Sequence, residues 1–227
     1  MNVALQNRLQ TGAEALGLAL DSAQLTLLMD FLVLLQKWNK VYNLTAVRDP
    51  EEMLTHHLLD SLAAVLPPRR HVAQAGLAAP VRLLDVGSGG GLPGVGFAIC
   101  CPGVDVSCVD TVGKKAAFIQ QAAVQLRLPN LHGVHARVES LVTPFEVVSC
   151  RAFAALADFT AWSRQALAPH GVWLAMKGKH PEEELAALPA DVQVFHVEQL
   201  AVPGLGAERC IVWMRPAAQD GQGGAVA

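Results

Sequence analysis

The feature that most constrains the fold is a run of glycines directly after a short apolar segment. Residues 81–86, VRLLDV, have the length and composition of a buried strand, and residues 87–94, GSGGGLPG, follow at once. Glycine allows tight turns and lets a ligand approach the main chain without a Cβ in the way. At the end of the first strand of an open α/β sheet, such a loop forms a ligand crevice. The loop therefore predicts an α/β protein with a binding site at Gly87.

The chain from residue 81 onward alternates short apolar runs with stretches of helical character. Seven runs are expected to be strands: 81–86, 104–109, 131–135, 146–150, 172–176, 192–197 and 210–214. Helical stretches or turns separate the first five, a pattern typical of a mostly parallel sheet with helices on both faces. The last two are close in sequence and are expected to form an antiparallel pair at an edge.

Helical periodicity predicts an N-terminal extension before this core. Apolar residues recur at helical spacing in residues 3–17 and again from Ser22, a plausible cap, to about Trp38. A third helix is expected to be capped by Asp49, to begin at Pro50 and to end before Pro67. The chain is therefore divided into a helical extension at 1–66, a linker at 67–80, a core at 81–216 and a disordered tail at 217–227.

Composition and charge narrow the class of protein. No apolar run approaches the roughly 20 residues that cross a bilayer, and the N-terminus lacks the pattern of a signal peptide. Five cysteines without a C-x-x-C pair predict reduced thiols in the cytoplasm and no metal site. The net charge of −3 argues against a wide grip on naked nucleic acid, so RNA contact is expected to be local or to involve a preassembled particle. A monomer is the default expectation.

The residues around the glycine loop discriminate between nucleotide ligands. The Gly-Lys-Ser/Thr ending of a P-loop is missing. The dinucleotide pattern fits residues 89–94, but Pro93 interrupts it and Asp85 precedes the loop, where a carboxylate repels a pyrophosphate. S-adenosylmethionine carries sulfonium and ammonium charges and no phosphate. The order Asp85-x-Gly87-x-Gly89-x-Gly suits that ligand.

Further along the chain, polar groups stand where this ligand needs them. The second strand ends in Asp110, which is placed to hold ribose hydroxyls. After the third strand, Val138 and Glu139 are placed beside the adenine. Each acid alone fits a strand-end cap, but the ordered set predicts a methyltransferase that uses S-adenosylmethionine.

Six stretches between residue 37 and about 180 carry a closer resemblance. They are KWNKVYNLTAVRDPEEMLTHHLLDSL, LLDVGSGGGLPG, VDTVGKKAAFI, ARVE, CRAFA and KGK. In order and spacing they resemble the bacterial small-subunit ribosomal RNA methyltransferase G family, also called glucose-inhibited division protein B. The first and fifth are specific to that family, whereas most methyltransferases share the glycine loop. The family usually has Ser where this chain has Cys150, and Phe-Asp where it has Phe145-Glu146.

The resemblance implies a Rossmann-like class I methyltransferase with a helical N-terminal extension. It implies that the substrate is the guanine at position 527 of 16S ribosomal RNA, methylated at ring nitrogen seven, within a small ribosomal subunit or an assembly particle. The positions that correspond to the family's cofactor contacts are Gly87, Leu92, Val138, Glu139 and Arg151.

The chemistry of that reaction requires the enzyme to position the methyl donor and the acceptor nitrogen. Ring nitrogen seven of guanine has a free lone pair and no proton to lose, so attack on a sulfonium methyl needs neither a general base nor a covalent intermediate. The enzyme has to hold donor and acceptor in line at about 3 Å. Methylation at carbon 5 of cytosine would need a thiolate, for which Cys150 is the candidate. A small apolar residue at a strand end is the favoured interpretation of Cys150.

Two groups of residues are expected to face the substrate. Arg151 is expected to contact cofactor, phosphate or base, or to pair with an acid such as Asp85 or Glu139. His57 shares a helical face with Asp60, and the two either orient each other at the cleft or pack the extension onto the core.

The stretch at residues 37–48 is expected to help shape the guanine site through Asn43 and Lys40. Trp38 or Tyr42 is expected to stack on an unpaired base or to dock the extension. The cations expected at phosphates are Lys37, Lys40, Arg48, Lys114, Lys115, Lys177 and Lys179.

Several alternatives stay open at this point. They are a methyltransferase for another RNA or a small molecule, a ribosome assembly factor that binds the cofactor without catalysis, and, more distantly, a nicotinamide oxidoreductase.

A thermal shift assay separates the ligand classes. S-adenosylhomocysteine is expected to raise the melting temperature because a ligand that binds only the native state stabilises it. NAD is expected to leave the melting temperature unchanged, and stabilisation by NAD alone would contradict the interpretation of the loop.

Overall fold

A seven-stranded sheet with the order β3-β2-β1-β4-β5-β7-β6 organises the computed structural model, which describes residues 3–218. The strands are β1 (Val81–Val86), β2 (Val104–Asp110), β3 (Leu131–His135), β4 (Phe145–Arg151), β5 (Leu167–Lys177), β6 (Val192–Leu200) and β7 (Arg209–Pro216). β1 to β5 pair in parallel, and β7 runs antiparallel to both β5 and β6. The predicted sheet is confirmed, with β6 at the edge.

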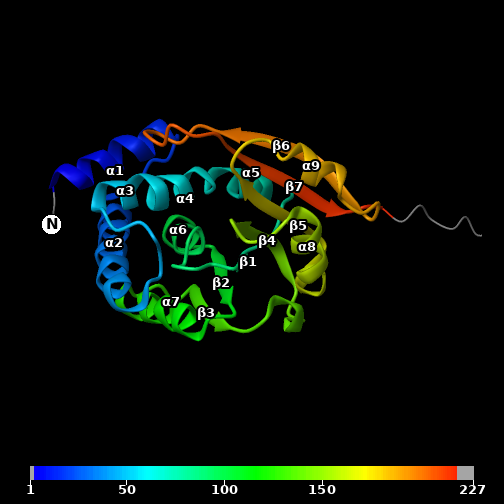
Figure 1. The fold of residues 1–227 in the computed structure, drawn as a ribbon, viewed down its shortest axis with the longest axis horizontal. Coiled ribbons are helices and arrows are strands. Elements are labelled where there is room, and N and C mark those ends of the chain that lie inside the picture. The colour runs from blue at the N-terminus through cyan, green and yellow to red at the C-terminus, as the bar shows by residue number, and fades with distance from the viewer. Residues whose placement is uncertain (1–2, 219–227) are drawn as a thin grey trace, which may run out of the picture.

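Helical elements precede the sheet and connect its strands (Figure 1). The extension contains α1 (Val3–Ala15), α2 (Ser22–Tyr42), α3 (Pro50–Met53), the π-helical turn η1 (Leu54–Leu59), α4 (Asp60–Ala63) and α5 (Leu66–Gln74). The core contains α6 (Gly94–Cys100), α7 (Gly113–Gln125), α8 (Leu156–Trp162), α9 (Glu182–Ala186) and the short 3-10 turns η2 (Val138–Ser140) and η3 (Arg164–Ala166).

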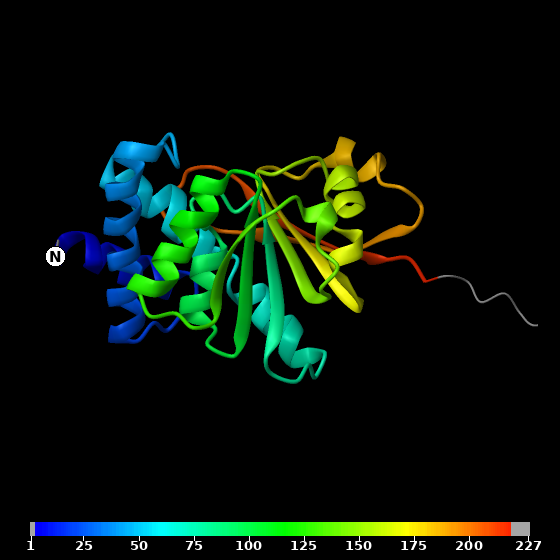
Figure 2. The same ribbon diagram turned by 90° about the horizontal axis from the view of Figure 1, so that it is seen from below.

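Alternation along the strands builds a core on each face of the sheet. Leu83 belongs to the cluster under α6 and α7, whereas its neighbour Leu84 belongs to the cluster under α8. Successive side chains of a strand point to opposite faces, so both faces of a central strand have to be apolar. The extension adds its leucines to the first cluster and lies outside α6 and α7 (Figures 1 and 2). Extension and sheet therefore share one hydrophobic core, and the boundary at residue 66 stays a prediction.

The second helix differs from its prediction at both ends. Asp21 is the cap, because its side chain accepts from the backbone N–H of Gln24 while the side chain of Gln24 accepts from the backbone N–H of Asp21. Ser22 is the first helical residue. At the other end the helix continues past Trp38 to Tyr42, and Asn43 ends it in a left-handed conformation with φ of 48°.

The predicted start of the third helix is confirmed. The prediction of a linker at 67–80 is wrong for most of that range, because α5 occupies residues 66–74. Asp49 accepts from the N–H groups of Glu51 and Glu52, both at 3.0 Å. Pro67 and Pro68 lie in the first turn of α5, where a missing N–H costs nothing, so they start a helix and do not mark a loop. Only residues 75–80 are irregular. Of the predicted tail, residues 219–227 lie outside the described residues.

Aromatic contacts dock the extension onto the core. The ring of Trp38 lies 5.5 Å from that of Phe118 in α7 and 5.0 Å from that of Tyr42, measured between centroids. Leu44, just beyond the helix, is buried in the same cluster. The docking interpretation of Trp38 is thereby confirmed.

Three further observations concern the lengths of the helices, the possible metal ligands and the cysteines. Within residues 3–218, none of the helices combines the length and the apolar character needed to cross a bilayer. The same residues contain no group of three or more His, Cys, Asp or Glu side chains arranged to hold a metal ion. All five cysteines are buried and free.

Truncation of Trp38 tests how firmly the extension is docked. Trp38→Ala is expected to lower the free energy of unfolding by about 3 kcal/mol, because it removes a large packed ring. Val33 on the same helix is 60% exposed, so Val33→Ala is the control and is expected to change stability by less than about 0.5 kcal/mol. Urea unfolding measures both, and equal effects would contradict the docking role.

Candidate active site

The glycine loop is hydrogen-bonded to the neighbouring strand and leaves no room for a side chain at Gly87. The N–H groups of Gly87 and Ser88 donate to the carbonyl of Val109 at 2.9 and 3.3 Å. Gly87 has φ of +67°, and a Cβ there would lie 2.3 Å from a ring carbon of Phe153. Glycine is therefore required at this position by both conformation and space.

Asp85 lies behind the loop and does not reach the crevice, contrary to the prediction that it faces the cofactor. Its side chain points to the α6 face of the sheet, as Leu83 does two residues earlier, and is 0% exposed. One carboxylate oxygen accepts from the N–H of Gly94 at 3.0 Å and the other from the hydroxyl of Ser149 at 3.1 Å. Burial raises the pKa of Asp85 to about 6, although the bonds from Gly94 and Ser149 oppose this shift. Asp85 thus holds the loop onto the first turn of α6.

A cavity of about 340 Å³ opens at the carboxyl ends of β1, β2 and β3, and we call it the donor cleft. It contains four of the predicted cofactor residues: Gly87, Asp110, Val138 and Glu139. The carboxylate of Asp110 accepts from the N–H groups of Val112 at 2.8 Å and Gly89 at 3.1 Å. Strand-end acids at the mouth of a cleft are what a ribose diol requires, so these residues fit the predicted ligand.

The apolar wall of the donor cleft consists of residues that the sequence interpretation missed. Phe153 and Trp162 meet edge to face, with ring centroids 5.9 Å apart. Phe153 also covers Gly87. A flat apolar wall in the same cleft as Val138 suits a planar heterocycle such as adenine. The CRAFA stretch contains Phe153, but no spacing rule singles it out.

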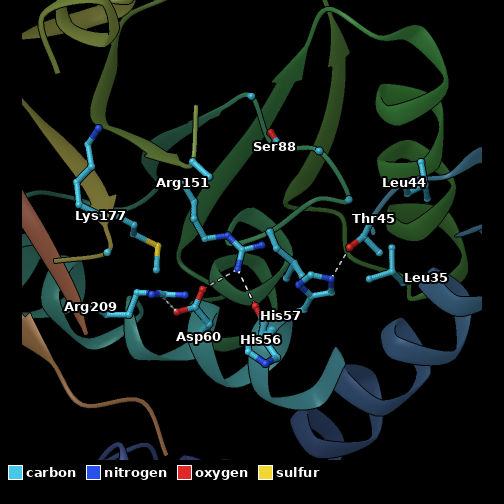
Figure 3. A pocket seen from close by; sticks show the side chains of 17 residues that line it. Leu35, Leu44, Thr45, His56, His57, Asp60, Ser88, Arg151, Lys177 and Arg209 are labelled. Carbon is cyan, nitrogen blue, oxygen red and sulfur yellow. Dashed lines mark hydrogen bonds and ion pairs between the residues drawn. The ribbon is translucent and has the colours of Figure 1, made fainter. Parts of the chain in front are cut away.

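A second cavity of about 490 Å³ lies beside the first, and we call it the acceptor cavity (Figure 3). Gly87 and Ala152 line both cavities and form the junction between them. Six predicted site residues line the acceptor cavity: Gly87, Gly89, Leu92, Arg151, His57 and Lys177. The extension contributes Leu44, Thr45 and the η1 turn, so the cavity exists only where extension and core meet.

Asp60 pairs with two arginines at the floor of the acceptor cavity (Figure 3). Its buried carboxylate accepts from Nη1 of Arg151 at 2.9 Å and from Nε of Arg209 at 2.8 Å. The acid that pairs with Arg151 is thus neither Asp85 nor Glu139. Charge-assisted bonds of this kind are short and strong. Asp60 therefore fixes the direction of both guanidinium groups.

The π-helical turn supplies a second anchor for Arg151. Within this turn the amide of Asp60 bonds to the carbonyls of Thr55 and His57, and the carbonyl of His56 accepts from Nη1 of Arg151 at 3.2 Å. Single π turns are frequent at functional sites because they re-aim side chains and free carbonyl groups.

His57 bonds to the extension loop and not to Asp60, contrary to one of the two interpretations of that pair. Its Nε2 lies 2.7 Å from Oγ1 of Thr45. Asn39 holds this loop in place, because its side chain accepts from the N–H of Thr45 at 2.9 Å and donates to the carbonyl of Val47 at 3.3 Å. Burial, and then the charge of Arg151, lower the pKa of His57, which keeps its ring neutral near pH 7.

The remaining predicted substrate residues lie at or beyond the rim. Asn43 caps α2, and its side chain accepts from Arg48 outside the cavity. Lys177 lines the cavity but donates to Glu184 at 2.7 Å. Lys115 pairs with Asp110 at 3.7 Å. The other predicted cations, Lys37, Lys40, Arg48, Lys114 and Lys179, are located outside both cavities.

Cys150 does not have the surroundings of a nucleophile. It is 1% exposed, and burial raises the pKa of its thiol far above the usual range. A reactive cysteine needs access and a stabilised thiolate, and neither is present here. The small apolar interpretation of Cys150 is the one that the structure supports.

Known structures define the class of protein to which this fold belongs. Magnesium protoporphyrin IX methyltransferase from Synechocystis PCC 6803, solved with bound S-adenosylmethionine, matches with a TM-score of 0.57 at 14% identity, over 87% of this chain and 98% of that one. TrmN from Thermus thermophilus matches with a TM-score of 0.54 at 17% identity, over 72% and 53% of the two chains. At these identities the likeness concerns the fold alone. The fold is the Rossmann-like class I fold of S-adenosylmethionine-dependent methyltransferases.

Sequence relatives define the family. The family model described as rRNA small subunit methyltransferase G matches residues 24–212. Proteins named ribosomal RNA small subunit methyltransferase G from Acidovorax ebreus (strain TPSY) and Acidovorax sp. (strain JS42) are 77% and 78% identical over 221 residues, which cover 96% of this chain and 98% of each relative. The chain belongs to the rRNA small subunit methyltransferase G family, and S-adenosylmethionine is the methyl donor of this class.

The position of Asp85 predicts a characteristic pH dependence of stability. Its pKa is higher in the folded chain than in the unfolded chain, so its stabilising contribution is present below about pH 4 and is lost as the pH rises through 6. Asp85→Asn cannot ionise. Its stability relative to the wild type is therefore expected to improve by up to about 3 kcal/mol between pH 4 and pH 8, as measured by urea unfolding.

Ser149→Ala is the companion variant. It removes a hydroxyl that donates to the ionised carboxylate, so its loss of stability is expected to be greater at pH 8 than at pH 4. Two pH profiles parallel to the wild type would contradict the assignment of Asp85 as a buried, titrating group.

Proposed function

We propose that the chain transfers the methyl group of S-adenosylmethionine to ring nitrogen seven of guanine 527 in 16S ribosomal RNA. The observation that supports this most is the junction at Gly87 and Ala152, where the donor cleft opens into the acceptor cavity. A methyl group passed between the two cavities would never cross bulk water. The resemblance of the family-specific stretches supplies the position and the ring atom.

The residues of the donor cleft fit the cofactor. Asp110 offers its carboxylate to ribose hydroxyls, and Phe153 with Val138 offers apolar surface to adenine. Bound there, the cofactor supplies an electrophilic methyl group on a positively charged sulfur. The chain's own task is to hold the base, exclude water and leave the attacking lone pair free.

Three titratable side chains that line the acceptor cavity, those of His57, Asp60 and Lys177, already have protein partners. The ring of His57 is neutral and bonded to Thr45. Asp60 accepts from two arginines, and Lys177 donates to Glu184. This supports a reaction at a nitrogen that has no proton to lose, which ring nitrogen seven of guanine satisfies and an exocyclic amine does not.

Arg151 is placed to orient the base. Its Nη1 donates to Asp60 and to the carbonyl of His56, whereas no bond from its Nε or Nη2 is present within residues 3–218. The Hoogsteen edge of guanine carries two acceptors, O6 and N7. A donor directed at O6 alone would fix the base and leave the lone pair of N7 exposed. We assign that role to the free edge of Arg151.

Methylation of defined RNA tests the proposal. Small ribosomal subunits and the corresponding naked RNA are prepared from cells that lack the gene and are incubated with the protein and labelled S-adenosylmethionine. Digestion followed by mass spectrometry is expected to show 7-methylguanosine at position 527, mainly in the particle. Label on another nucleotide, or on an exocyclic amine, would contradict the proposal.

Arg151→Lys separates base orientation from cofactor binding. The variant keeps the charge but loses the planar donors, so kcat/KM for RNA is expected to fall about 100-fold, equivalent to about 3 kcal/mol. The affinity for S-adenosylhomocysteine, measured by calorimetry, is expected to change less than about threefold. Arg70→Lys, an exposed arginine paired with Glu198, is the control. A large loss of S-adenosylhomocysteine affinity would instead place Arg151 on the cofactor.

A further inference from the structure

We propose that RNA reaches the acceptor cavity across one flank only, which consists of the end of α2, the loop that follows it and the first turn of α7. This basic flank is defined by Lys37, Lys40, Arg48 and Lys114. The inference rests on the proposed function and adds to it the path of the RNA backbone: of the cations that the sequence suggests as phosphate contacts, it selects these four and excludes Lys177 and Lys179.

The acceptor cavity has two opposite sides. Leu44 and Thr45, which follow α2, stand on one side of Arg151, and Lys177 stands on the other (Figure 3). Lys177 is the last residue of β5 and leads toward α9. A strand of RNA that delivers a base to Arg151 therefore has to lie over one side or the other.

The cations of the basic flank have no carboxylate partner within residues 3–218. Lys37, Lys40 and Lys114 make no ion pair there, and Arg48 donates to the neutral side chain of Asn43. A cation without a carboxylate partner has no ion pair to break when it binds a phosphate. Lys115, next to Lys114 in sequence, differs because Asp110 engages it.

Helix packing brings these cations to the same end of the structure. α2 and α7 lie side by side, joined by the contact between Trp38 and Phe118 (Figure 2). Tyr42 lies one turn beyond Trp38, and Lys114 lies one turn before Phe118. α2 ends at the loop that lines the acceptor cavity, and α7 begins just after Asp110 at the donor cleft. Both turns therefore stand at the carboxyl edge of the sheet.

The carboxylates near the basic flank are mostly engaged. Asp49 caps α3, and Glu51 pairs with Arg8. Asp49 and Glu52 are the exposed acids without an ion pair there, among the residues that the structure describes, against the four cations of the flank. Positive charge therefore exceeds negative charge along this flank. Tyr42 adds a ring that is 39% exposed and is braced by Trp38, a surface on which an unpaired base can stack.

The opposite side repels a polyanion. Between β5 and α9 lies a hollow of about 640 Å³ lined by four carboxylates and two ammonium groups, and we call it the acidic flank. The carboxylates are those of Glu182, Glu183, Glu184 and Glu208, and the ammonium groups are those of Lys177 and Lys179. Glu184 already engages Lys177 at 2.7 Å. Lys177, predicted from the sequence as a phosphate contact, is thereby engaged by the protein itself. Lys179, predicted likewise, makes no ion pair within residues 3–218 but lies among these carboxylates.

Salt dependence of binding tests the path directly. The probes are small ribosomal subunits from cells lacking the gene, bound to the wild type, Lys40→Ala, Lys114→Ala, the double variant and Lys179→Ala. The slope of log affinity against log salt concentration is expected to fall by about 0.7 for each phosphate that a cation no longer neutralises, if the RNA there is single-stranded. The slope of the double variant is expected to fall by about 1.4. Lys179→Ala is expected to match the wild type or to bind more weakly by less than about twofold.

Two outcomes would overturn the proposal: a wild-type slope for the double variant, or a reduction by Lys179→Ala as large as that by Lys40→Ala. Calorimetry with S-adenosylhomocysteine is expected to give the same affinity for all variants, which shows that each folds with an intact donor cleft. Because binding is measured without catalysis, failure of the wild type to methylate guanine would count against the proposed function and leave this test informative.

Discussion

The buried carboxylate of Asp60 joins three distant parts of the chain. It lies in the extension, and it accepts from Arg151 at the end of β4 and from Arg209 at the start of β7. Breaking one partner of a buried pair typically costs about 3–5 kcal/mol, because the remaining charge stays in the protein without compensation. The extension is therefore part of the active cavity, since without it Arg151 would lose its anchor and the cavity would lose one wall.

The donor cleft and the acceptor cavity meet at a narrow junction. Gly87 forms one side, and Phe153 covers it so closely that no Cβ fits. Ala152 forms the other side, with φ of +51°, a conformation that costs a residue with a side chain about 1 kcal/mol or more. The backbone turns at Ala152, between Arg151 and Phe153. As a result the side chain of Arg151 enters the acceptor cavity, whereas the side chain of Phe153 lines the donor cleft. One turn of backbone thus serves both substrates.

Sequence reasoning predicted where a residue lies in the fold when the determinant is local. The glycine loop, Asp110 and Val138 are placed by strand ends, and strand ends follow from short apolar runs. It missed Arg209, which is separated from Asp60 by 149 residues and belongs to no motif. It placed Asp85 in the crevice because it considered the charge of this residue and not the alternation of side chains along β1, which turns Asp85 toward α6. The lysines could be sorted only after their partners were known, since an ion pair such as that of Lys177 with Glu184 depends on the folded chain.

A crystal structure with bound S-adenosylhomocysteine tests most directly whether the two cavities form one methyl-transfer path. The result expected is a ribose on Asp110, an adenine between Val138 and Phe153, and a sulfur atom at the junction of Gly87 and Ala152 that faces Arg151. A ligand seated in the acceptor cavity, or one whose sulfur is turned away from Arg151, would contradict the proposed path.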